Sequence, residues 1–132
     1  KAVFCMNPAI DEARRYLALA ADDAAAFRGM LSVPEIKFRL ACFHAQQSVE
    51  KSLKAVLVLH GIEQRRTHDL NLLAQLLVDQ DIKPPYSPEE LTRLNPFAVT
   101  FRYDDCDIPL ITATEVNNIV TRIHRWATDL VR

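Results

Sequence analysis

Glycine is scarce in this sequence. The 132 residues include only Gly29 and Gly61, and neither interrupts a long apolar pattern. A β-sandwich or barrel needs frequent tight turns, where glycine supplies backbone angles that other residues avoid. The scarcity therefore favours a helical fold. At 15.0 kDa we expect a single domain over residues 1–132, because this length is enough to bury one core.

Cysteines and long apolar runs are also in short supply. Cys5, Cys42 and Cys106 are too few and too scattered for a disulfide framework, and no two of them form a Cys-x-x-Cys pair. No apolar run reaches the roughly 18 residues that a bilayer-spanning helix needs, and no signal peptide is evident. We therefore expect reduced thiols and a cytoplasmic protein.

Charge of one sign is lacking as well. The sequence has 16 Lys and Arg against 17 Asp and Glu, a net charge of −1, so no global basic field indicates nucleic-acid binding. A local basic patch stays open, because binding depends on how charge is distributed. No His, Cys, Asp or Glu group has the spacing of metal ligands, including the acidic residues around Cys106, and no glycine-rich phosphate loop occurs. We therefore predict no metal and no cofactor.

The apolar residues instead recur at helical spacing. Asn7 is placed to cap a first helix with Pro8 in its first turn, and Gly29 marks the predicted end. A second, longer helix is predicted over residues 34–60, with Pro34 in its first turn. Gly61 stands where a left-handed residue commonly ends a helix.

The remaining sequence predicts shorter helices. Thr67 is the expected cap of a third helix, and Ser87 begins a fourth that Pro96 must end or kink, giving two short pieces. The last helix starts near Thr112, which has capping-box spacing to Glu115. The sequence therefore predicts an all-α bundle of four main helices plus a short broken or accessory helix.

Long polar side chains are unusually dense in the second helix. The polar strip consists of Gln46, Gln47, Glu50, Lys51 and Lys54. Gln46, Glu50 and Lys54 lie four apart, and Gln47, Lys51 and Lys54 follow at four and three. Such spacings place side chains on one side of a helix. Three interpretations remain open: a solvated face, a polar seam that sets the register of a homodimer, or part of a binding site.

The same helix carries a resemblance to a known family. The segment "FHAQQSVEKSLKAVLVLHGIEQRRTHDLNLLAQLL" resembles the core of the HEPN family. Prokaryotic members show an A-x-Q-Q-A-x-E-K-x-L-K-A helix, then T-H-D-L opening the next helix. The later "NPFAVTFRYDD" is similar to a family segment that ends in an Arg-Tyr pair, here Arg102 and Tyr103. The resemblance covers residues 43–105.

The resemblance implies an up-and-down helical bundle, usually a homodimer. HEPN proteins often occur beside a small nucleotidyltransferase, as toxin and antitoxin or as binding partners. Many members are metal-independent ribonucleases, in which an Arg is followed after four to six residues by a His. Histidine can move protons near neutral pH, and arginine can stabilise the charge on a phosphorane.

This ribonuclease motif is incomplete here. Arg102 matches the Arg, but residues 107–109 are Asp, Ile and Pro, so the His is missing. Arg39 and His44 have the spacing but lie in the middle of the second helix, where the family does not place its motif. We therefore expect a non-catalytic or weakly catalytic protein. An active ribonuclease toxin that recruits His68 or His44 is the alternative, and a dimeric scaffold without catalysis is another.

The segment before the third helix is the expected anion site. There His68, Arg65, Arg66 and backbone N–H groups can receive a phosphate; alternatively, the histidine bonds locally and the arginines are solvated. Arg102 and His68 are the catalytic candidates. The leading hypothesis is a nucleotide- or RNA-phosphate-binding homodimer that partners a nucleotidyltransferase. Its candidate binding residues are Gln47, Glu50, Lys51, Lys54, Arg65, Arg66, His68, Arg102 and Tyr103.

Overall fold

Helices make up the secondary structure throughout the described part of the chain. The computed structural model describes residues 7–64, 66–99 and 110–132, and no strand occurs in these ranges. The elements are α1 (Pro8–Leu31), α2 (Phe38–Leu59), α3 (Leu70–Val78), α4 (Pro88–Leu91), the 3₁₀ helix η1 (Thr92–Ala98) and α5 (Ala113–Val131). The prediction of an all-α bundle is confirmed. None of the described helices is both long and apolar enough to cross a membrane.

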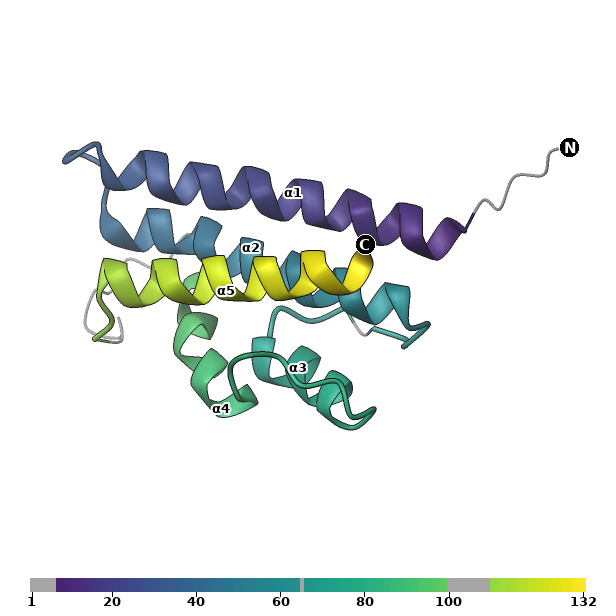
Figure 1. The fold of residues 1–132 in the computed structure, drawn as a ribbon. Helices are drawn as coiled ribbons and strands as arrows, with labels where there is room; N and C mark the ends of the chain where they lie inside the picture. The colour runs from purple at the N-terminus through teal and green to yellow at the C-terminus, as the bar shows by residue number, and fades with distance from the viewer. Residues whose placement is uncertain (1–6, 65, 100–109) are drawn as a thin grey trace, which may run out of the picture.

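Three long helices lie side by side, and the short ones cover one side of the bundle. Helix α1 runs antiparallel to α2 and α5, while α3 and α4 lie on the side of α2 away from α1 (Figure 1). Helix α2 packs against α1, α3, η1 and α5. This long central helix therefore positions those four elements, and α4 packs on α3 and η1.

The start of α1 follows the sequence prediction, and its end does not. Asn7 Oδ1 accepts hydrogen bonds from the backbone of the first turn, and Pro8 occupies the first helical position. The helix continues past Gly29 to Leu31, so the predicted end is wrong. Phe27 is fully buried and Met30 packs against the core, so burial carries the helix beyond the glycine.

For α2 the predicted end is correct and the predicted start is not. The helix begins at Phe38, so the predicted first-turn role of Pro34 is wrong. Pro34 instead lies in a turn closed by a 3.0 Å hydrogen bond from Ile36 N to Val33 O. At the other end, Gly61 has a φ of +66°, the left-handed conformation expected after the last helical residue.

Helix α3 begins two residues later than its sequence suggests, with Asp69 and not Thr67 as its N-cap residue. Thr67 does not cap it: Thr67 Oγ1 accepts from the backbone N–H of Asp69, which is itself the N-cap residue. The first helical N–H, that of Leu70, donates to Asn95 Oδ1 at 2.9 Å. Because Asn95 belongs to η1, a distant part of the chain caps this helix.

The fourth helix is divided into two short pieces as predicted, but the division falls after Leu91 and not at Pro96. Ser87 and Glu90 form a reciprocal capping box at the start of α4, which ends at Leu91. The chain then continues as η1, which contains Pro96. Proline cannot donate the hydrogen bond of an α-helix and its ring collides with the carbonyl four residues earlier, so the tighter 3₁₀ form follows.

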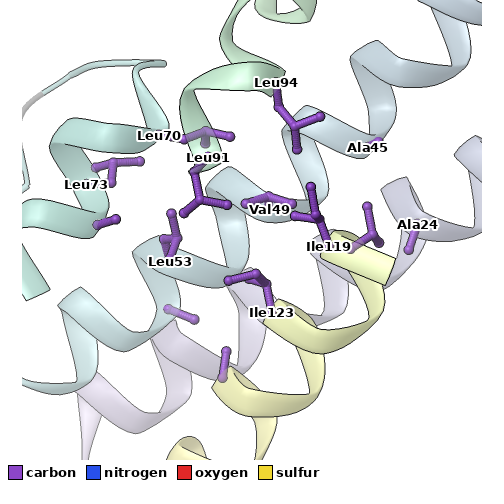
Figure 2. Close-up of a cluster of buried hydrophobic side chains, with 14 of the residues drawn as sticks. Ala24, Ala45, Val49, Leu53, Leu70, Leu73, Leu91, Leu94, Ile119 and Ile123 are labelled. Atoms are coloured by element: carbon purple, nitrogen blue, oxygen red, sulfur yellow. The ribbon is translucent and has the colours of Figure 1, made fainter. Parts of the chain in front are cut away.

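Helix α5 completes the core against the centre of α2. It starts with the predicted capping box between Thr112 and Glu115. Figure 2 shows Val49 and Leu53 of α2 between leucines of α3, α4 and η1 and the side chain of Ile123. Burial of each such side chain stabilises the fold by about 1.5–3 kcal/mol. This packing holds α2, and with it the polar strip, in a fixed orientation relative to the other helices.

Candidate functional site

The polar strip does not form one solvated face. Gln46 is fully buried and Glu50 is 3% exposed, so the interpretation of the strip as a solvated face is wrong for these two residues. Gln46, Glu50 and Lys54 engage one another and the connection between α2 and α3, whereas Lys51 bonds to α1. The strip therefore divides into two polar clusters on different sides of α2.

The carboxylate of Glu50 is the centre of the first cluster. Its Oε1 accepts hydrogen bonds from His68 Nδ1 at 2.9 Å and Gln46 Nε2 at 3.3 Å, and its Oε2 accepts from Lys54 Nζ at 2.9 Å. A buried charge is costly unless opposite charge and hydrogen bonds compensate for lost water. Three donors from two parts of the chain provide that compensation.

The side chain of Gln46 also holds the α2–α3 connection, through the backbone of His68. Its Nε2 also donates to the carbonyl oxygen of His68 at 3.0 Å, while its Oε1 accepts from Gln47 Nε2 at 2.7 Å. His68 is thus fixed to α2 both by its imidazole and by its main chain. The helical spacing of Gln46 and Glu50 indicates a shared face, but the sequence contains no local signal that this face binds His68.

The bond to Glu50 also sets the chemistry of the His68 ring. A carboxylate oxygen accepts, so Nδ1 carries a hydrogen and Nε2 is the other ring nitrogen. The side chain is 68% exposed, and no described residue bonds to Nε2. This nitrogen can accept a hydrogen bond in the neutral ring or donate one in the protonated ring.

An open pocket of about 620 Å³ lies beside this imidazole. One wall comes from the α2–α3 connection, with Arg66, His68 and Asp69, and the other comes from η1, with Asn95 and Ala98 among its residues. Arg66 is exposed and makes no hydrogen bond or ion pair with a described residue. The pocket therefore offers a guanidinium and an oriented imidazole, beside one carboxylate.

The start of α3 contributes less to this pocket than the sequence suggests. The N–H groups of Asp69 and Leu70 already donate to Thr67 Oγ1 and Asn95 Oδ1. Asn95 Nδ2 in turn donates to Asn71 Oδ1 at 3.0 Å. These two backbone donors are therefore not free for an anion.

The second cluster lies between α1 and α2. Asp23 of α1 accepts from His44 Nδ1 at 3.0 Å and from Lys51 Nζ at 2.5 Å. Ser48 Oγ donates to the carbonyl oxygen of Ala20 nearby along α1. Lys51 is therefore not brought together with His68. Sequence reasoning missed Asp23, whose signal is an acidic residue within the alanine-rich part of α1.

Several candidates fall outside the described residues. Arg65, Arg102 and Tyr103 are among them, as is the acidic segment around Cys106, so their roles stay predictions. Within the described ranges, no three His, Cys, Asp or Glu side chains gather as a metal site would require.

Fold and polar clusters together define the class of the protein. It is an all-α bundle whose central helix uses a buried Gln–Glu pair to hold the segment that opens the next helix. The model of the HEPN domain family matches residues 10–130, nearly the whole chain, and the chain belongs to this family. Searches of curated proteins and of solved structures returned no match.

Proposed function

We propose that this HEPN-domain protein is a homodimeric partner of a small nucleotidyltransferase in a toxin–antitoxin-type pair, and that it binds a nucleotide or RNA phosphate. The observation that carries the binding proposal is the His68–Glu50 pair beside the pocket. A buried carboxylate orients an exposed imidazole before any ligand arrives. Such preorganisation lowers the entropic cost of binding.

The two cationic or protonatable groups of the pocket are the proposed phosphate contacts. Arg66 brings a guanidinium, whose planar donors match phosphate oxygens, and His68 brings Nε2. A volume of about 620 Å³ is in the range of small-molecule sites. Glu50 has too little exposure for direct contact, so its proposed role, with Lys54 and Gln47, is to position His68.

The other candidates keep their places as proposals. Arg65, Arg102 and Tyr103 are proposed to extend the phosphate site, and homodimer formation and the nucleotidyltransferase partner rest on family membership. An adjacent nucleotidyltransferase gene, and co-elution of both products in size-exclusion chromatography, test the partnership. Separate elution under conditions where both proteins are folded contradicts it.

Binding is tested by titrating ATP and a short single-stranded RNA at low and high salt. We expect Arg66→Ala and His68→Ala to weaken binding, and high salt to weaken it further, because phosphate contacts are screened by ions. Arg14→Ala removes an exposed arginine of α1 and serves as the matched control. If wild-type protein binds neither ligand, the strip is only structural and the scaffold alternative stands.

A metal-independent ribonuclease toxin is the second candidate. It is favoured by the His68–Glu50 geometry, because a carboxylate-oriented imidazole with an exposed Nε2 can act as a general acid or base. Incubation of labelled RNA with the protein and EDTA distinguishes it. Cleavage that is lost in His68→Ala establishes the ribonuclease, and intact RNA rejects it.

A further inference from the structure

A second groove, of about 350 Å³, lies between α1 and α5. It is distinct from the pocket at His68, because α3 and α4 lie on the side of α2 away from α1 (Figure 1). The polar side chains that matter are Arg28 from α1, with Thr121, Arg125, Asp129 and Arg132 from α5 and the residue that follows it. Three of these five carry guanidinium groups.

Arg28 is held in place by neutral acceptors and not by a carboxylate. Its Nε donates to Asn117 Oδ1 at 2.9 Å, and its Nη2 donates to Thr121 Oγ1 at 3.0 Å. Both acceptors are neutral, so they orient the guanidinium without an opposing carboxylate. A positioned and uncompensated guanidinium is a suitable anion contact.

The other two arginines leave the groove with an excess of positive charge. Arg125 is exposed and makes no hydrogen bond or ion pair with any described residue. Arg132 pairs with Asp129 at 3.7 Å, and both side chains are largely exposed. Asp129 is the sole acid among the described residues lining the groove, so three guanidiniums face one carboxylate in a chain whose net charge is −1.

The uncharged lining adds a donor. Thr121 Oγ1 accepts from Arg28, and no described residue accepts its hydroxyl hydrogen. Thr128 already donates to the carbonyl oxygen of His124, and His124 Nε2 donates to that of Leu17. The His124 bond joins α5 to α1, and the Thr121 hydroxyl and the guanidiniums are donors that an oxyanion can use.

We propose that this groove binds the phosphate group of a small phosphorylated ligand. Guanidiniums bind phosphate through paired donors, and the volume suits a small molecule better than a helix or a strand. The described apolar lining is Ala21 and Ala24, with no Phe, Tyr or Trp ring on which a base can stack, and the imidazole of His124 is bonded to Leu17. Recognition therefore falls on the phosphate rather than on a base or an apolar peptide face.

The test compares isothermal titrations of inorganic phosphate, adenosine monophosphate and unphosphorylated adenosine at low salt. We expect both phosphates to bind, adenosine not to bind, and Arg125→Ala to lower affinity about tenfold, because a charge-assisted contact is lost. Arg125→Glu should abolish binding. Arg122→Ala, which removes a neighbouring exposed arginine of α5 outside the groove lining, should change nothing.

Variants of the first pocket keep the two proposals separate. Affinity for inorganic phosphate that persists in an Arg66→Ala/His68→Ala double variant supports the groove even if nucleotide or RNA binding fails. Absence of phosphate binding to the wild type, or equal binding by wild type and Arg125→Glu, overturns the proposal. So does a result in which an oligoglutamate peptide binds in an Arg125-dependent manner while phosphate does not. Arg125 is exposed, so its replacement leaves the core intact.

Discussion

Nδ1 of His68 lies 2.9 Å from Oε1 of Glu50, which joins an exposed imidazole to a carboxylate buried in α2. The Gln46–Glu50 pair in this helix is therefore part of the architecture that presents His68. Gln46 supports the same residue through its backbone carbonyl. The pair acts on the pocket indirectly, by holding the connection that lines it.

Replacing Glu50 by Ala should lower the free energy of unfolding by about 2–4 kcal/mol, because Lys54 loses its carboxylate partner and Gln46 loses one of its two acceptors. Urea unfolding followed by circular dichroism measures this loss. Glu63→Ala, at an exposed glutamate of the connection, is the control and should remain close to wild type. Equal stability of the Glu50 variant and this control would show that the buried ion pair has no net stabilising effect.

Gln46→Leu should keep the volume of the side chain and lose the hydrogen bond to the His68 carbonyl. We expect a destabilisation of about 1–3 kcal/mol, since a buried acceptor loses its partner. Amide hydrogen exchange should become faster around the α2–α3 connection than in α5. The exposed Gln80→Leu is the matched control. Unchanged exchange around the connection would contradict its attachment through Gln46.

Asn95→Ala should remove the cap of α3 and cost about 1 kcal/mol, as the loss of a capping side chain typically does. Thermal unfolding measures the effect. Asn118→Ala is the matched control and should not lower the melting temperature, because Asn118 is exposed within α5 and alanine favours helices there. A melting temperature that falls equally in both variants would rule out a specific role for the cap.

Cys42 should be unreactive in the folded protein. Burial raises the pKa of its thiol from 9.0 to about 12, so little thiolate is present near pH 8. In a Cys5→Ser/Cys106→Ser background, a thiol reagent should label the protein slowly until urea unfolds it. Fast labelling under native conditions would show that this part of α2 opens readily.

The same shift gives a stability profile at high pH. The unfolded thiol ionises near its ordinary value while the folded thiol stays protonated, so the unfolded state binds fewer protons. The thiol's contribution is complete below pH 9.0 and is lost as pH rises toward about 12. In the Cys5→Ser/Cys106→Ser background, adding Cys42→Ala should flatten this part of the stability curve, and an unchanged slope would assign the loss to other groups.

Local signals predicted the fold well because the helix starts are largely encoded in adjacent residues. The Asn7 cap and the capping boxes of Ser87 and Thr112 need only three or four consecutive positions. The start of α3 was predicted wrongly, since its first N–H finds its acceptor on Asn95, far along the chain. A tertiary cap of this kind leaves no local pattern.

The sequence predicted which residues belong to the site better than it predicted which of them contact one another. The spacing of Gln46 and Glu50 correctly places them on a common face, and His68 was singled out from its position before a helix. Helical periodicity could not show that Lys51 bonds to Asp23 of α1. Adjacent residues such as Glu50 and Lys51 differ in direction by about 100° around a helix, so they contact different neighbours, and packing decided how the strip divides.

Asn95 joins the two walls of the His68 pocket, because it bonds to the start of α3 from η1. A ligand that bridges these walls therefore binds only molecules in which both elements are docked. By mass action, such a ligand suppresses local opening of α3 and raises the melting temperature with its concentration. The melting temperature therefore reports how much of the His68 pocket is occupied. The measurement applies to any compound and needs no knowledge of a reaction or partner.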